Sequence, residues 1–248
     1  MGNTKVKTIL ITQTKPETEK NPYAELAKKH RLKIDFRPFI YLEPVSSQDF
    51  RKKRVHIPDY TAVIFTSRNA VDHFFRMASE MRVMVPEETK YFCISESTAY
   101  YLQKYITYRK RKVFHGKQNI TDLIEVIKKH KEEKFLLPCT DIHKQEIPEF
   151  LKKNGIRFTE AVIYKTVCSD LSDLEKVNYD MLVFFSPSGI KSLFKNFPKF
   201  KQNATRIAAF GPTTAQAVLD ARLRLDIQAP MPGIPSMTMA IEQYLKKS

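Results

Sequence analysis

The sequence lacks tryptophan altogether, has only 3 cysteines among 248 residues, and contains no long apolar run. No stretch approaches the roughly 20 consecutive apolar residues that a membrane-spanning helix needs. The N-terminal segment MGNTKVKTILIT lacks the apolar core of a signal peptide. Cys93, Cys139 and Cys168 lie far apart, without the spacing of zinc ligands. We therefore expect a cytoplasmic protein with reduced, buried cysteines and no metal site.

Several common catalytic and cofactor motifs are also missing. The sequence has no Gly-x-Gly-x-x-Gly fingerprint and no Walker lysine loop, so nucleotide binding has little support. The 6 histidines include no His-Glu-x-x-His pair, and we interpret them as surface residues. The segment FSPSG is not a nucleophile elbow, because Phe184 stands where that motif has its first glycine.

Acidic residues are scarce relative to basic ones: 27 Asp and Glu face 42 Lys and Arg, which gives a formal net charge of +15. Basic runs lie at Arg51–Arg54 and Lys104–Lys117. A solvated surface, nucleic acid binding and attraction of a polyanionic small molecule all agree with this charge. The absence of zinc-finger, RNA-recognition and basic-zipper signatures weakens the case for nucleic acid.

What the sequence does contain is an internal repeat of strand, hydroxyl-rich turn and helix. Val63–Phe75 aligns without gaps on Leu182–Phe194, and Phe92–Leu102 aligns on Ala208–Val218. The matched hydroxyl residues are Ser67 with Ser186 and Thr98 with Thr214. Such a turn at the carboxyl end of a strand offers backbone N–H groups and hydroxyls to an anionic ligand. The same residues would also serve simply as helix caps.

Apolar periodicity predicts that strands and helices alternate along the chain. The predicted strands cover residues 6–12, 32–36, 60–65, 91–94, 113–114, 135–137, 158–164, 181–185, 207–210 and 226–228. The predicted helices include 22–30, 48–54, 69–81, 97–104 and 142–154, and a terminal helix capped by Ser236. Extended segments flank the middle part of the sequence, and we interpret them as the places where the chain passes from one domain to the other. Alternating elements of this kind predict mainly parallel sheets.

The sequence therefore predicts an α/β protein of two similar domains with mainly parallel sheets, connected by two extended crossings, with the turns of both domains around a shared cleft. We expect one discontinuous domain from residues 1–37 and 168–248 and an inserted domain from residues 44–162. The linker strands would be residues 38–43 and 163–167.

Several segments resemble the uroporphyrinogen-III synthase family. The matching pieces are FTSRNAV, VIYKTV, FFSPSGI, AAFGPTTAQAV, NPYAELAKKH and LPCTDIHKQEIPEFLKKNGI, which cover nearly the whole chain in the right order. The resemblance implies two flavodoxin-like domains joined by a two-stranded extended linker, with the active-site cleft between them. It also implies a cofactor-free lyase of porphyrin and heme biosynthesis. Such an enzyme cyclises hydroxymethylbilane, a linear polycarboxylate, to uroporphyrinogen III with loss of water and inversion of ring D. An alternative is a non-catalytic tetrapyrrole- or nucleic-acid-binding regulator of the same architecture.

The resemblance also implies roles for individual residues. It makes Tyr164 the candidate proton donor to the departing hydroxyl, although by pattern alone Tyr164 reads as a half-buried strand aromatic. The implied substrate-binding residues are Thr66, Ser67, Arg68, Asn69, Thr98, Ser186, Ser188, Gly189, Arg206, Thr213 and Thr214. Two departures stand out, because Ser95 and Thr140 occupy positions where the family commonly has glycine.

The expected partners follow from the same resemblance. We expect a monomer whose partner is the polycarboxylate hydroxymethylbilane, with no metal, no membrane and no nucleic acid. The basic runs leave open a transient contact with the upstream enzyme that makes the bilane.

Overall fold

The computed structural model describes residues 5–16, 21–117, 119–143, 145–174 and 178–247. The chain divides into two compact units. Unit 1 comprises Met1–Tyr41 and Val167–Ser248, and unit 2 comprises Leu42–Thr166. Among the described residues, we find no helix with the length and apolar character needed to cross a membrane.

Unit 1 is built on one sheet, whose described strands lie in the order β11-β10-β9-β1-β2 and pair in parallel throughout. These strands are β1 (Thr8–Ile11), β2 (Lys33–Phe36), β9 (Met181–Phe184), β10 (Arg206–Phe210) and β11 (Ile227–Ala229). The helices are α1 (Pro22–His30), α7 (Pro187–Asn196), α8 (Pro212–Asp220) and α9 (Met237–Lys247). Numbered within the unit, the strand order is that of flavodoxin-like sheets, with a switch point between β1 and β9.

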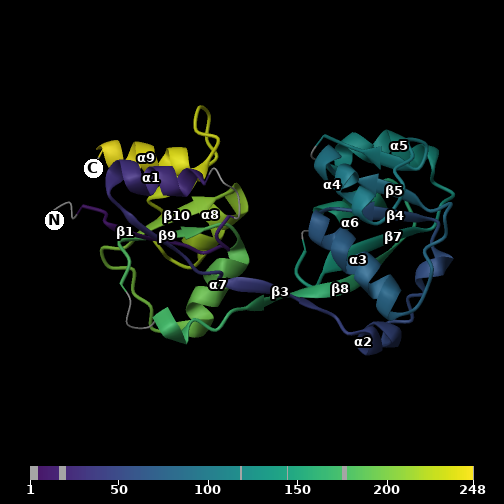
Figure 1. Cartoon of the computed structure of the whole chain (residues 1–248), viewed down its shortest axis with the longest axis horizontal. Coiled ribbons are helices and arrows are strands. Elements are labelled where there is room, and N and C mark those ends of the chain that lie inside the picture. The colour runs from purple at the N-terminus through teal and green to yellow at the C-terminus, as the bar shows by residue number, and fades with distance from the viewer. Residues whose placement is uncertain (1–4, 17–20, 118, 144, 175–177, 248) are drawn as a thin grey trace. The chain divides into compact units, whose positions relative to one another are not determined.

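Two helical layers cover the faces of this sheet, α1 with α9 on one side and α7 with α8 on the other (Figure 1). Ile9 and Ile11 of β1 pack toward α1 and α9, whereas Leu10 between them packs toward α7 and α8. A parallel strand buried on both faces needs apolar residues at successive positions. This requirement explains the uninterrupted apolar residues Ile9–Ile11 of β1 and Met181–Phe184 of β9.

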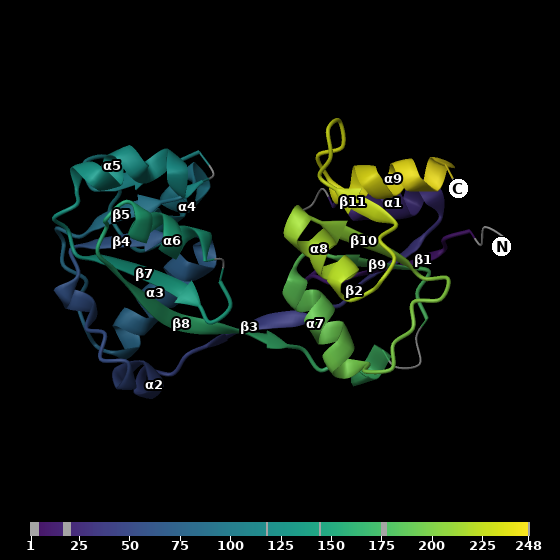
Figure 2. The same ribbon diagram turned by 180° about the vertical axis from the view of Figure 1, so that it is seen from behind.

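Unit 2 contains the second sheet, with described strands in the order β3-β8-β7-β4-β5-β6 (Figure 2). These strands are β3 (Ile40–Pro44), β4 (Ala62–Phe65), β5 (Lys90–Cys93), β6 (Val113–His115), β7 (Phe135–Thr140) and β8 (Phe158–Cys168). The helices are α2 (Ser47–Lys52), α3 (Arg68–Glu80), α4 (Glu96–Tyr101), α5 (Ile124–Lys129) and α6 (Glu146–Lys153). The strands from β4 to β8 pair in parallel, and the neighbours β3 and β8 carry the chain between the two units.

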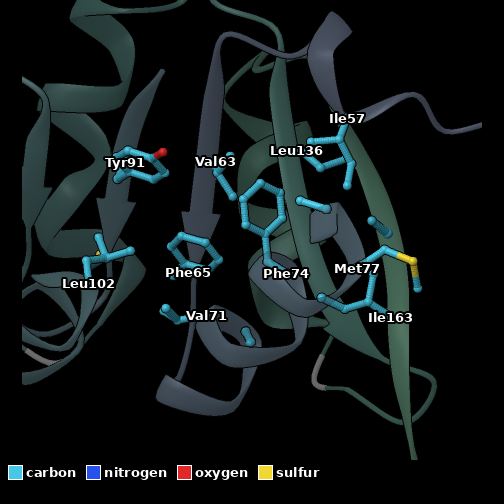
Figure 3. Packing of buried hydrophobic residues seen from close by; sticks show 14 of the residues in the cluster. Ile57, Val63, Phe65, Val71, Phe74, Met77, Tyr91, Leu102, Leu136 and Ile163 are labelled. Atoms are coloured by element: carbon cyan, nitrogen blue, oxygen red, sulfur yellow. The ribbon is translucent and has the colours of Figure 1, made fainter. Parts of the chain in front are cut away.

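The larger core of unit 2 lies between the sheet and α3 (Figure 3). Phe65 of β4 meets Phe74 of α3 edge to face, with ring centroids 5.5 Å apart. Both rings are almost fully buried, at 0% and 1% exposure, and burying one such side chain contributes about 1.5–3 kcal/mol. On the opposite face of the sheet, Ile127 of α5 and Leu151 of α6 pack in the same cluster as Ile64.

The two mainly parallel α/β sheets confirm the predicted fold class. One predicted helix is wrong at its start, because α6 begins at Glu146 rather than at Ile142. The backbone N–H of Asp141 donates to the carbonyl of Tyr164 at 3.3 Å, and the Asp141 carboxylate accepts the N–H of Thr166 at 2.9 Å. These bonds tie residue 141 to β8, so the helix starts only after the chain has turned away.

Asp180 connects the two distant sequence segments that form unit 1. Its carboxylate accepts hydrogen bonds from the backbone N–H groups of Lys7 and Thr8 at 2.8 and 2.9 Å, and from the Thr8 hydroxyl at 3.0 Å. Burial raises the pKa of Asp180, but the hydrogen bonds from Lys7 and Thr8 together lower it below its usual value of 3.8. Because the folded pKa lies below the unfolded one, this stabilisation is present above about pH 4 and is lost as the pH falls through the folded pKa.

We predict that Asp180→Asn lowers the free energy of unfolding at pH 7 by about 1–3 kcal/mol, because charge-assisted hydrogen bonds become neutral ones. The difference from the wild type should shrink below about pH 4, where the wild-type carboxyl also becomes protonated. Urea unfolding at pH 7 and at pH 3, followed by circular dichroism, measures both. Asp220→Asn, on the exposed surface of α8, is the control. An equal loss at both pH values would contradict the charge argument.

Candidate active site

In unit 2, two serine-capped helices begin next to each other at the carboxyl end of the sheet. Phe65 of β4 pairs with Cys93 of β5, and the helix cap follows two residues later on each strand. Ser67 caps α3 by accepting a backbone N–H of the first turn at 3.1 Å. Ser95 caps α4 in the same way, accepting the N–H of Thr98 at 3.3 Å.

Unit 1 repeats this arrangement at the ends of β9 and β10. Phe184 pairs with Ala209, and the cap again follows two residues later. Ser186 accepts the N–H of Gly189 at 3.3 Å and has φ and ψ of −155° and 153°, close to the −165° and 163° of Ser67. The repeat in the sequence therefore has one backbone geometry in both units. A cap occupies only one of the four donors of a helix N-terminus, so capping and ligand binding are compatible.

The fourth turn differs from the other three. Gly211 has a φ of +88°, a conformation that strains any residue with a side chain. Within the described part of the chain, no side chain caps α8, which leaves the first-turn N–H groups of Thr213 and Thr214 without a capping side chain. Ser95, by contrast, has an ordinary φ of −139° and uses its hydroxyl on the N–H of Thr98. The turn at Gly211 is thus the more open anion site of the two.

Tyr164 lies near the end of β8, where the strand carries a bulge. Thr140 pairs with Tyr164 while Cys139 pairs with Val162, so Ile163 is the extra residue. The bulge turns Tyr164 onto the same face as Ile163, in the core that contains α3.

The phenol of Tyr164 hydrogen-bonds the side chain of Ser67, and its ring stacks on the imidazole of His73 with centroids 4.7 Å apart and planes 17° apart. The side chain is 6% exposed. Burial raises the pKa of Tyr164 by more than the hydrogen bond from Ser67 lowers it. The phenol is therefore protonated at neutral pH and suits a proton donor rather than a base.

The contact between His73 and Tyr164 is one that the sequence analysis missed, since the ring of His73 is half-buried and packs on Tyr164. Burial, followed by the charge of Arg76, lowers the pKa of His73. Arg76 Nε lies 3.4 Å from His73 Nδ1, so this nitrogen accepts and Nε2 carries the proton. Arg76 Nη2 donates to the carbonyls of Val45 and Ile163 at 3.1 and 3.0 Å. Arg76 thus fixes both the histidine and the strand beside Tyr164.

One signal in the sequence could have suggested this pair. His73 and Arg76 follow the FTSRN segment and lie one helical turn apart.

The remaining sequence-predicted residues divide by exposure. Thr66 and Ser188 are half-buried at the strand-end turns, whereas Arg68, Asn69 and Thr213 are exposed. The guanidinium of Arg68 lies over the ring of Tyr101, 5.5 Å from its centroid.

Two hydroxyls point inward, because the side chains of Thr98 and Thr214 are only 4% and 2% exposed. The Thr98 hydroxyl also lies 3.0 Å from that of Ser95. Thr98 therefore offers neither its hydroxyl nor its N–H to a ligand, while Thr214 keeps its first-turn N–H.

Arg206 lies away from the turn of Thr213. It is the first residue of β10, and its N–H donates to the carbonyl of Asp180 at 2.8 Å at the amino edge of the sheet. The whole length of β10 separates it from Gly211, so the structure does not bring Arg206 to the carboxyl edge.

Parallel sheets whose carboxyl edges present hydroxyls and helix N-termini define an α/β protein with edges suited to anionic ligands. The model of the family described as uroporphyrinogen-III synthase HemD matches residues 21–239. The chain belongs to the uroporphyrinogen-III synthase family. As a member it is a cyclising lyase that converts hydroxymethylbilane to uroporphyrinogen III.

Individual relatives agree with this assignment. The chain is 24% identical to the uroporphyrinogen-III synthase of Chlorobaculum parvum, over 97% of this chain and 100% of the relative. It is 26% identical to that of Saccharomyces cerevisiae, over 79% of this chain and 82% of the relative. The fold resembles the crystal structure of the Helicobacter pylori enzyme, with a TM-score of 0.65, 17% identity and coverage of 98% and 100%. A mutant enzyme of Thermus thermophilus gives a TM-score of 0.60 at 15% identity, with coverage of 98% and 100%.

We predict that Gly211→Ala lowers the free energy of unfolding by about 1–3 kcal/mol, because a side chain strains this backbone conformation. The same change should raise the KM for the substrate, since the turn relaxes away from the geometry that presents the first-turn N–H groups. Ser95→Ala is the matched variant in unit 2, and it should cost only the cap, about 1 kcal/mol.

Thermal unfolding and steady-state kinetics of the two variants provide the comparison. An unchanged KM in Gly211→Ala would contradict the role of the turn in binding.

Proposed function

We propose that Tyr164 and the strand-end turns carry out the cyclisation in this chain. Tyr164 protonates the departing hydroxyl of hydroxymethylbilane, and the turns of both units hold its carboxylates. The observation that carries the proposal is the phenol at the bulge of β8, hydrogen-bonded to Ser67 and stacked on His73. The proposed binding residues are Thr66, Ser67, Arg68, Asn69, Ser186, Ser188, Thr213 and the first-turn N–H of Thr214. The N–H of Gly189 is already donated to Ser186, so Gly189 is left out.

The charge of the chain supports a polycarboxylate as substrate. A net charge of +15 attracts anions over the whole surface. The N-terminal ends of α3, α7 and α8 supply fixed partial positive charge where the strands end. Backbone N–H groups at helix starts bind carboxylates without a metal ion or a dedicated arginine for each group.

The proton balance assigns a clear role to the phenol. Tyr164 gives its proton to the hydroxyl, which leaves as water, and the proton released when the new carbon–carbon bond closes the ring restores the phenol. The hydrogen bond from Ser67 stabilises the transient phenolate and so makes Tyr164 a stronger acid at the moment of transfer. His73 and Arg76 act as positioning residues, since they hold the ring and the strand that carries it.

Ring inversion requires control of conformation rather than strong acid–base chemistry. The linear substrate can close without enzyme, and without inversion it gives the type I isomer. Binding the carboxylates at several fixed turns selects the folded shape from which the inverted ring forms, which is catalysis by positioning.

We propose in addition that the chain acts as a cytoplasmic monomer. The three cysteines are free in the structure, as expected in a reducing compartment. A transient contact with the enzyme that supplies the bilane is proposed for the basic runs at Arg51–Arg54 and Lys104–Lys117.

We predict that the purified protein forms the type III isomer and that Tyr164→Phe lowers kcat by about a hundredfold, the usual effect of losing a general acid. As enzymatic turnover falls, spontaneous closure should shift the product toward type I. Chromatographic separation of the oxidised isomers measures the ratio. Tyr91→Phe, a buried tyrosine of the same core, is the matched control and should behave like the wild type.

The isomer formed by the wild type and the kcat of Tyr164→Phe test two different claims. Type I as the sole product of the wild type would overturn the assigned activity. Normal kcat in Tyr164→Phe would remove only the role of the phenol.

We predict that Ser67→Ala and Ser186→Ala lower stability by similar amounts, about 1 kcal/mol each, because both remove the same cap. Their kinetics should differ, since only Ser67 hydrogen-bonds Tyr164. Ser67→Ala should lower kcat as well as raise KM, whereas Ser186→Ala should raise KM alone. Equal effects of both variants on kcat would argue against a link between Ser67 and the phenol.

A further inference from the structure

The side chains of Cys139, His143 and Glu160 meet on the side of unit 2 opposite to Tyr164. One ligand atom from each, a thiol sulfur, an imidazole nitrogen and a carboxylate oxygen, lies within 4.8 Å of the other two. By strand alternation, Cys139 and Glu160 share the sheet face of Leu137, which packs with α5 and α6. Tyr164 belongs to the core on the other face. The cluster therefore lies on the other face of the sheet from the Tyr164 ring, although Cys139 is close enough to raise the pKa of the phenol.

The orientation of His143 is fixed by the backbone. Its Nδ1 lies 2.8 Å from the carbonyl oxygen of Thr140, which can only accept a hydrogen bond, so Nδ1 carries the proton. The other nitrogen, Nε2, lies 2.9 Å from Oε2 of Glu160 and 3.4 Å from the amide nitrogen of Gln145. Histidines that bind metals in proteins typically donate their second N–H to a backbone carbonyl in this way.

Nε2 and Oε2 of Glu160 are at hydrogen-bond distance, 2.9 Å, so the two atoms share either a proton or, once they move apart, a bound metal ion. A second proton on the imidazole, which makes an ion pair, is the simplest candidate. A metal ion is the other, and the third donor, the sulfur of Cys139, distinguishes the two. A thiol contributes nothing to a His–Glu ion pair, whereas thiolate, imidazole and carboxylate together are a donor set that zinc prefers.

The distances suit such an ion. Tetrahedral zinc with its usual bond lengths holds its ligand atoms about 3.3–3.6 Å apart. To admit the ion, Nε2 of His143 and Oε2 of Glu160 must move apart from 2.9 Å by about 0.5 Å, while the sulfur of Cys139 lies within 4.8 Å of both. Cys139 is 4% exposed, so its sulfur has little access to solvent. A water molecule would complete the coordination.

We propose that Cys139, His143 and Glu160 bind one zinc ion that joins β7, β8 and the loop before α6. The position of His143 supports a structural role, because this loop replaces the first turn of the helix expected from Ile142. The site adds a metal-binding function to the substrate binding proposed at the strand-end turns.

The experiment uses the full chain, purified in the presence of a chelator that is then removed. Cobalt(II) serves as the spectroscopic probe, since a thiolate ligand gives an intense near-ultraviolet charge-transfer band and a tetrahedral site gives visible ligand-field bands. We expect both bands to saturate at a single equivalent and zinc to displace the cobalt. Absence of the charge-transfer band, or zinc binding without saturation at a single equivalent, would overturn the proposal.

Variants assign the ligands. Cys139→Ser should abolish the charge-transfer band, and Glu160→Gln should weaken zinc binding by about tenfold or more. Cys168→Ser, which removes a thiol from the same strand as Glu160, is the matched control and should keep both band and affinity. Glu160 is partly exposed, so its variant remains informative even where Cys139→Ser fails to fold. Retention of the band in Cys139→Ser, or its loss in Cys168→Ser, would show that the metal binds elsewhere.

Discussion

Parallel strand pairing is the constraint on which the whole site depends. It brings the carboxyl ends of β4 and β5 together in unit 2, and those of β9 and β10 in unit 1, in the same register. Because every helix that follows such a strand starts at the same edge, its first-turn N–H groups collect there without any charged side chain. A basic chain with few acid–base residues at its strand ends can therefore bind a polycarboxylate through its backbone.

The repeated motif has the same backbone geometry at the first turn of both units, but its second turn and its neighbours differ. Ser67 and Ser186 have nearly the same backbone angles and make the same cap. The second pair of turns differs, since Ser95 satisfies a helix donor that Gly211 leaves to a ligand. Tyr164 has come to lie beside the cap of Ser67 and not beside that of Ser186. The proposed proton donor therefore belongs to unit 2, whereas unit 1 has the turn whose first helix donors have no capping side chain.

Local signals in the sequence were enough to predict the fold class and the serine caps. Asn21 and Pro22 begin α1 as expected, because cap chemistry depends on neighbouring residues alone. Arg206 shows the limit of this reasoning. It is close to GPTTA in the sequence, but the strand between them places Arg206 at the opposite edge of the sheet. The contacts of His73 with Tyr164 and of His143 with Glu160 arise only from packing and from the pairing of β7 with β8. No periodicity reports such contacts.

The bulge in β8 links these separate features. In a regular strand Ile163 and Tyr164 would face opposite sides of the sheet, and the phenol would lie on the side of α6. The extra residue places both on the side of α3, where Ser67 and His73 meet the ring. It leaves Cys139 and Glu160, which precede the irregularity on their strands, on the opposite face. One inserted residue thus places the proposed proton donor and the proposed metal ligands, which are only a few residues apart, on opposite faces of the same pair of strands.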